Sequence, residues 1–169
     1  MFLPEIINNF NVYKDGTKLV GVTDEVQLPD IALAVTEISG AGISPYETPI
    51  LGKTEKMEMD ITFRTIEKDA FSLANPMKSH EITLRGNIQE SDGQGDPKQV
   101  GMRVVVKGKC KAFKPGKMKQ NEAMDTVASL SLTYIMIEVG GEKMLEVDKQ
   151  NSVFIIDGED IMADIKKNC

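Results

Sequence analysis

The stretch Met57-Glu-Met-Asp-Ile-Thr-Phe63 alternates apolar and polar side chains throughout. In an extended strand, successive side chains point to opposite faces, so this period of two places Met57, Met59, Ile61 and Phe63 on one face. We therefore expect residues 57–63 to form a strand with one buried face and one solvated face.

The same period recurs further along the chain. Apolar residues alternate with polar ones over residues 80–89 and again over residues 100–111. Between them lies the polar segment 90–97, which contains Ser, Asp, Gly and Pro and is typical of a loop. This order predicts a long hairpin.

Two further hairpins are indicated by their turn residues. Asp15-Gly16 lies between the strand-like residues 10–13 and 17–23, and Gly140-Gly141 lies between 127–139 and 143–147. Asp-Gly and Gly-Gly supply the positive φ angles that tight hairpin turns require.

Two short helices are expected. Residues 67–74 carry acidic residues in the first turn and end before Asn75-Pro76. Asp157 is predicted to cap a second helix, which carries Lys166-Lys167 in its last turn. With seven or more strands, these helices predict a mainly β fold, either a β-sandwich or a partly closed β-barrel with one or two short flanking helices.

Composition limits the size and class of the protein. The chain has 169 residues and a mass of 18.6 kDa, with 41% hydrophobic and 27% charged residues. This predicts a single domain over residues 1–169. No run approaches the roughly 18 apolar residues of a membrane span, and the N-terminus lacks the pattern of a secretory signal, so we expect no membrane anchor. Cys110 and Cys169 are expected to be free thiols.

Charge is unevenly distributed. The net charge is -6, yet residues 98–119 contain eight basic residues and no acidic one. Clustered Lys and Arg can bind phosphates. However, Phe113 is the only aromatic residue available for stacking in this stretch, and the acidic remainder would repel a polyanion. We favour a solvated strand face, or one paired with acidic residues of a neighbouring subunit.

Residues 36–54 form an unusual segment. Glycines and prolines interrupt it, yet it also contains five large apolar side chains that a solvated loop would not need. Such a long segment is expected to be functional, and its apolar content argues against disorder. It is therefore predicted to be an extended arm that docks on another surface; the alternative is that it folds back on its own sheet.

The residues give little support for catalysis. His80 is the only histidine and lies on an apolar strand face, where a packed imidazole is the simpler interpretation. Gly93-Gln-Gly95 lacks the Lys-Ser/Thr pair of a phosphate loop. The absence of Trp disfavours a carbohydrate-binding module. We predict no catalytic residue, no cofactor and no metal site.

Three stretches carry a family resemblance: residues 3–13, Leu28-Pro-Asp-Ile31 leading to Glu37-Ile-Ser-Gly-Ala-Gly42, and Met57 to Thr65. They resemble the major tail tube proteins of contractile-tailed bacteriophages and of R-type phage-tail-like bacteriocins. The resemblance implies a structural subunit that forms stacked hexameric rings around a channel, with long hairpins joining a multi-subunit β-barrel, for genome delivery or membrane puncture.

The resemblance also implies partners and a location. The partners would be further copies of the chain, the sheath, a tape-measure protein, the baseplate and a tail terminator, and DNA would pass through without specific binding in a phage. The protein would be part of a virion tail tube or a bacteriocin particle, assembled in the bacterial host cytoplasm. Alternatives are a tube-fold secretion-system subunit, a baseplate or tail-completion subunit, or a non-assembling β binding module.

Candidate residues follow for three surfaces. The predicted inter-ring contact arm comprises Ile38, Gly40, Gly42, Ile43, Pro45, Tyr46, Pro49, Ile50 and Leu51. The candidates for lining the channel are Glu58, Asp60, Glu81, Asn87, Gln89 and Glu90. A basic face, expected to meet a neighbouring subunit or the sheath, comprises Arg103, Lys107, Lys109 and Lys111.

Overall fold

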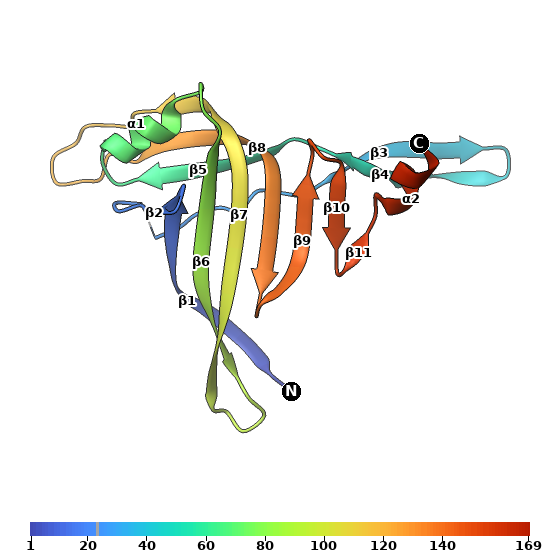
Figure 1. Cartoon of the computed structure of the whole chain (residues 1–169), viewed down its shortest axis with the longest axis horizontal. Coiled ribbons are helices and arrows are strands. Elements are labelled where there is room, and N and C mark those ends of the chain that lie inside the picture. The colour runs from blue at the N-terminus through green and yellow to red at the C-terminus, as the bar shows by residue number, and fades with distance from the viewer. Residues whose placement is uncertain (23) are drawn as a thin grey trace.

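One large antiparallel sheet dominates the computed structural model, which describes residues 1–22 and 24–169 (Figure 1). Thr23, the last residue of the predicted strand 17–23, lies outside the described residues. The sheet runs in the order β11-β10-β9-β8-β7-β6-β1-β2, and β5 also pairs with β8. Its strands are β1 (Leu3–Lys14), β2 (Thr17–Lys18), β5 (Met57–Phe63), β6 (His80–Ser91), β7 (Pro97–Lys114), β8 (Thr126–Val139), β9 (Glu142–Asp148), β10 (Val153–Ile156) and β11 (Glu159–Asp160).

The sheet wraps around a single core. The long strand β8 pairs with β5 along its first half and with β9 along its second half. Beyond β2, Val22 forms an isolated bridge with Phe63 of β5, and Arg64 N–H donates to Gly21 O at 2.8 Å. Among the described residues, this bridge and hydrogen bond bring the segment after β2 against the end of β5, but no continuous β-ladder joins the two. The mainly β prediction is confirmed, in an open, wrapped form rather than a closed barrel.

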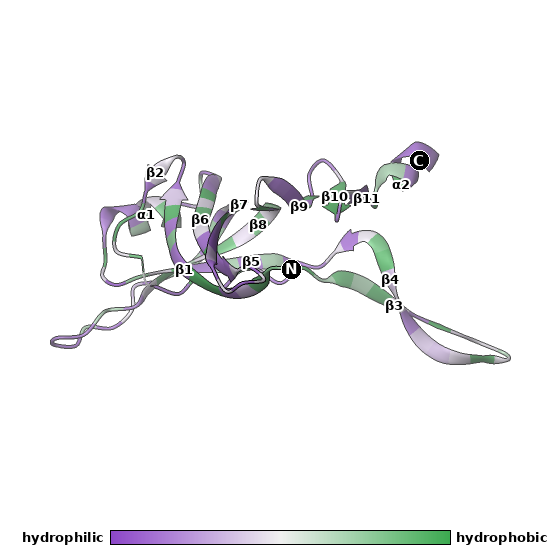
Figure 2. Cartoon of the chain, turned by 90° about the horizontal axis from the view of Figure 1, so that it is seen from below, coloured by the Kyte–Doolittle hydropathy of each residue, from purple (hydrophilic) through white to green (hydrophobic). Residues whose placement is uncertain are grey.

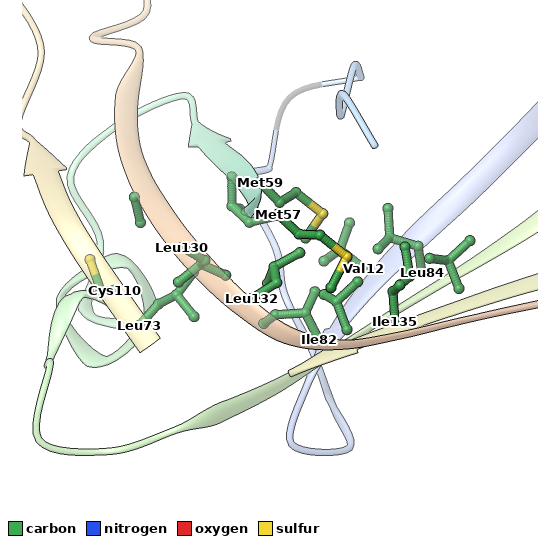
Figure 3. Packing of buried hydrophobic residues seen from close by; sticks show 14 of the residues in the cluster. Val12, Met57, Met59, Leu73, Ile82, Leu84, Cys110, Leu130, Leu132 and Ile135 are labelled. Atoms are coloured by element: carbon green, nitrogen blue, oxygen red, sulfur yellow. The ribbon is translucent and has the colours of Figure 1, made fainter. Parts of the chain in front are cut away.

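The alternation in β5 forms the centre of the core. Met57, Met59, Ile61 and Phe63 are each at most 2% exposed, whereas the intervening Glu58 and Asp60 are exposed. Figure 3 shows the two methionines packed among apolar side chains from neighbouring strands, including Val12, Ile82 and Leu132. The predicted strand and its orientation are confirmed.

Helix α1 (Lys68–Ala74) covers one end of this core. Ala70 and Leu73 are fully buried, and Leu73 lies beside Cys110 and Leu130 (Figure 3). The helix ends at Asn75, ahead of Pro76, as the sequence predicts.

The long hairpin predicted from residues 80–111 is formed by β6 and β7, which stay in register from His80↔Gly108 to Ser91↔Pro97. In its turn, the Asp92 carboxylate accepts hydrogen bonds from the backbone N–H groups of Gln94 and Asp96 at 2.8 and 2.9 Å. The Gly140-Gly141 hairpin joins β8 to β9, also as expected.

The prediction of a second helix that begins at Asp157 is wrong for residues 157–162. Asp157 (φ 53) and Gly158 (φ 77) form the turn of a small hairpin between β10 and β11, and helix α2 (Ala163–Asn168) begins only afterwards. Asp-Gly favours left-handed turn geometry, which outweighs the capping preference of Asp here.

The N-terminal hairpin is also smaller than predicted. Asp15-Gly16 turns the chain, but β2 has two residues, and β1 pairs along most of its length with β6. Strand β1 begins at Leu3, seven residues before the predicted start at Phe10.

The predicted arm is a hairpin, formed by β3 (Leu33–Gly40) and β4 (Ile43–Thr54). It constitutes a separate two-stranded sheet that projects away from the large one (Figures 1 and 2). The ladder between β3 and β4 is interrupted by register shifts between Leu33 and Val35 and between Ile38 and Gly40. Its turn uses Gly42 at φ 80, which explains a glycine at that point.

Candidate assembly surfaces

The arm hairpin exposes apolar surface along its length. Val35, Ile43, Tyr46 and Leu51 are each 53–57% exposed. An isolated two-stranded hairpin is marginally stable in water, because it has no second layer to bury its side chains. The arm therefore has the composition and the exposure of a contact element.

All nine residues predicted for the arm lie on this hairpin or in its turn. Ile38 and Ile50 are half-buried and the other seven are exposed. At the base of the arm, the thioether of Met162 and the side chain of Ile165 pack against Gly52. The C-terminal segment thus supports the base of the arm and leaves its tip free.

The acidic and basic candidates share one face of the large sheet, because the strand register places them opposite one another. Glu81 pairs with Lys107 on β7, with 3.8 Å between carboxylate and ammonium. Arg103 pairs with Glu138 on β8 at 2.9 Å. We call this non-core face of β5, β6, β7, β8 and β9 the polar face.

Further along the polar face, the Lys111 ammonium contacts the Glu58 carboxylate, and this contact lowers the pKa of Glu58 although burial opposes the shift. Lys109 lies opposite Ser131. Arg103, Lys107 and Lys111 thus each have an acidic partner within the same chain. The expectation that this basic face meets a neighbouring subunit or the sheath stays a prediction.

The remaining channel candidates divide between the two faces. Asn87 and Gln89 lie on the polar face, where the Asn87 amide donates to Asn8 at 2.7 Å and the Gln89 amide donates to Glu5 at 2.9 Å. Asp60 is exposed on the outer side of β5. Glu90 follows Gln89 in a regular strand and therefore points to the opposite face.

Tyr134 forms a polar cluster where β7, β8 and β9 meet. Its hydroxyl donates to the Glu146 carboxylate at 3.1 Å, and the Lys107 ammonium lies 4.8 Å from the centre of its ring. Burial, followed by the nearby carboxylates of Glu146 and Asp148, raises the pKa of Tyr134 to about 12. The hydrogen bond from Lys143 lowers the pKa of Glu146. Sequence reasoning missed this cluster, because its members are brought together only by the strand register.

Sequence reasoning also missed a group of exposed apolar side chains at and just before the start of β1. Phe2, Leu3, Ile6 and Ile7 are each more than half exposed. The dipeptide Ile6-Ile7 was the available signal, since β-branched residues favour strands.

His80 is buried beside the turn between β1 and β2. It is 4% exposed, and its Nδ1 lies 3.4 Å from the Asp15 carboxylate, which also accepts the backbone N–H of Glu81. These contacts fasten the β1–β2 turn to the start of β6. Among the described residues, no group of three or more His, Cys, Asp or Glu is placed to hold a metal ion.

No helix within residues 1–22 and 24–169 is both long enough and apolar enough to span a membrane.

The chain is similar to known proteins over almost its whole length. The model of the family described as phage tail tube protein FII matches residues 4–169. The tail tube protein of Escherichia phage P2 is 23% identical over 172 residues, which cover 99% of this chain and 98% of the relative. The major tail tube protein of Serratia phage KSP20 is 23% identical over 165 residues, covering 97% and 94%.

A solved structure shares the fold. It is a cryo-EM structure of the PVC sheath/tube terminator of an extracellular contractile injection system in the extended state. The TM-score is 0.59 at 12% identity, and the match covers 80% of this chain and 96% of the other.

Proposed function

This chain belongs to the phage tail tube protein FII family and is a structural subunit of a tail tube; from that premise we propose that its copies form hexameric rings. The rings stack into a hollow tube inside a contractile sheath. The observation that carries this proposal is the arm hairpin, which exposes apolar side chains away from the body of the subunit.

Stacking of identical rings requires a heterologous contact, in which one surface of a subunit meets a different surface of the next. The arm is suited to that role, because it projects beyond the large sheet at one end of the molecule (Figure 1). Within a ring, neighbouring subunits cover each other's sheet edges, which an isolated β subunit would leave exposed. Long hairpins such as β6–β7 thereby join one multi-subunit barrel.

We propose that the polar face lines the channel. Glu81 and Lys107 on this face neutralise each other, as do Glu58 and Lys111. A wall of paired opposite charges attracts a passing polyanion only weakly. We therefore assign the acidic candidates on the polar face to the channel together with the basic face, in place of an acidic channel and a separate basic surface. Glu90, which points to the opposite face, is not among them.

The partners follow from this assignment. The outer surface of the tube meets the sheath, the ends meet the baseplate and a tail terminator, and the channel holds a tape-measure protein before DNA passes. In a headless bacteriocin the same tube punctures a membrane. The subunit has a structural role without catalysis, and the tube is assembled in the bacterial host cytoplasm.

Negative-stain electron microscopy of the purified protein at increasing concentration tests the proposal. We expect rings that stack into hollow rods. Single rings that never stack would favour a tail-completion subunit, and a protein that stays monomeric at high concentration would contradict the proposal.

A further inference from the structure

The two edges of the arm hairpin differ in their capacity to form hydrogen bonds. In an antiparallel ladder, directly opposed residues alternate between pairs that exchange backbone hydrogen bonds and pairs whose N–H and C=O groups point outward. Pro49 lies opposite Val35. Because proline has no N–H, this is a pair of the second kind.

The alternation then assigns the neighbouring pairs. Thr36 and Thr48 exchange hydrogen bonds, and the next pair, Glu37 and Glu47, again points its backbone groups outward. Along the outer edge of β3, Val35 and Glu37 both retain an N–H donor. Among the described residues, neither donor has a backbone acceptor outside the hairpin.

The outer edge of β4 is different. Pro45 and Pro49 both lack a donor, and only Glu47 between them retains one. Proline on an edge strand is a means of preventing the addition of another strand. One edge of the arm is therefore open to strand addition and the other is blocked.

The charge on the arm indicates the chemistry of the partner. Glu37 and Glu47 are directly opposite on one exposed face, an arrangement that destabilises a strand pair unless a cation lies nearby. Residues 98–119 of the same chain provide eight basic and no acidic side chains. One of them, Lys114, is exposed at the end of β7 and is not among the four residues assigned to the channel. A second copy of this chain therefore carries a complementary charge.

We propose that the arm joins a second copy through the open edge of β3. A strand of that copy pairs with the backbone of Val35 and Glu37, and a basic side chain from its residues 98–119 approaches Glu37 and Glu47. This inference rests on the proposed tube, and it specifies which strand of the arm makes the contact between copies.

Hydrogen exchange of the wild-type protein tests it without any substitution. Assembled rods and unassembled subunits are exchanged in deuterated buffer, then dissolved and compared amide by amide. We expect the Val35 and Glu37 amides to exchange about tenfold or more slowly in rods, whereas the ladder amide of Thr48 is protected in both states.

A matched pair of variants gives a second test. Val35→Pro removes the outward N–H, and Val35→Thr keeps it with a side chain of similar shape. We expect Val35→Pro to raise the concentration needed for rod formation about tenfold or more relative to Val35→Thr. Protection of the Thr48 amide in the unassembled Val35→Pro variant shows that its hairpin is intact. If that protection is lost, the variant has disrupted the hairpin, and the hydrogen-exchange comparison of the wild-type protein alone tests the proposed contact.

The outcomes separate the two proposals. Rods in which the Val35 and Glu37 amides exchange as fast as in free subunits would overturn the inference and leave the tube intact. Failure of the wild-type protein to form rods would overturn both.

Removal of charge by the double substitution Glu37→Gln and Glu47→Gln tests the basic partner. We expect it to weaken rod formation at low salt more than at high salt, and equal effects at both salt concentrations would contradict a basic partner.

Discussion

Gly108 lies where β7 and β8 approach too closely for a side chain. A Cβ at this position would overlap the backbone carbonyl of Ser131, whereas a Cβ at Gly101, on the same strand, would meet nothing within 4 Å. The close approach follows a β-bulge between Lys107 and Gly108. A bulge changes which backbone groups meet, so this requirement for glycine depends on the pairing of two strands.

We expect Gly108→Ala to lower the free energy of unfolding by about 1–3 kcal/mol, the usual cost of overpacking. Gly101→Ala is the control and should change it by no more than about 0.5 kcal/mol. Urea unfolding followed by circular dichroism measures both. Equal stability of the two variants would contradict the bulged register.

Ile61 tests the orientation of β5 more severely. Its side chain is 0% exposed, so Ile61→Asp places an unpaired carboxylate among apolar groups. We expect a loss of roughly 4 kcal/mol or more, enough to unfold an ordinary domain or leave it barely folded. The exposed neighbour Asp60 provides the control, because Asp60→Asn should leave the unfolding midpoint nearly unchanged. A well-folded Ile61→Asp protein would refute the assigned faces of β5.

At the level of elements, strands were predictable where one face is buried. The alternation over Met57–Phe63 identified β5 and the burial of each side chain, because burial on one face imposes a period of two. The arm was harder to predict. The prolines of β4 reduce its resemblance to a strand, and they are tolerated because both edges of the hairpin lie outside the large sheet. The Asp157-Gly158 turn could have been identified from its dipeptide alone.

The cluster around Tyr134 predicts how the contact among β7, β8 and β9 responds to alkali. The pKa of Tyr134 rises from 10.0 to about 12 in the folded protein. The folded state therefore holds the phenol proton more tightly than the unfolded state. The resulting stability is fully present below pH 10 and is lost as the pH rises towards 12.

Absorbance titration of the folded protein at the phenolate band measures this effect. We expect one component titrating near 12, and Tyr134→Phe should remove it. The same variant should show a smaller loss of stability between pH 10 and 12 than the wild type. A titration curve whose late component survives the substitution would contradict the assignment.

The arm should be separable from the fold of the subunit. Deletion of residues 40–51 leaves the core and the contact of Met162 with Gly52 in place, so we expect an unfolding midpoint close to that of the wild type. We also expect the deleted protein to form no rods. Sedimentation of concentrated samples measures assembly and urea unfolding measures the fold. Loss of folding would show instead that the arm stabilises its own subunit.

At the scale of the whole molecule, the surfaces assigned to assembly lie on different parts of the subunit. The arm projects beyond one end of the wrapped sheet (Figures 1 and 2). The polar face lies on the side of the sheet opposite the core. Such separation suits a subunit that makes one kind of contact along an axis and presents another surface to a channel. The sequence could not place Glu81 beside Lys107, because that proximity depends on the pairing of β6 with β7.

The most direct test of the central claim is a helical cryo-EM reconstruction of the assembled protein at a resolution that shows side chains. We expect six subunits per ring, with each arm hairpin contacting a subunit of the adjacent ring and the polar face turned towards the channel. A tube whose arms pack against their own subunits, or whose polar face points outward, would contradict it.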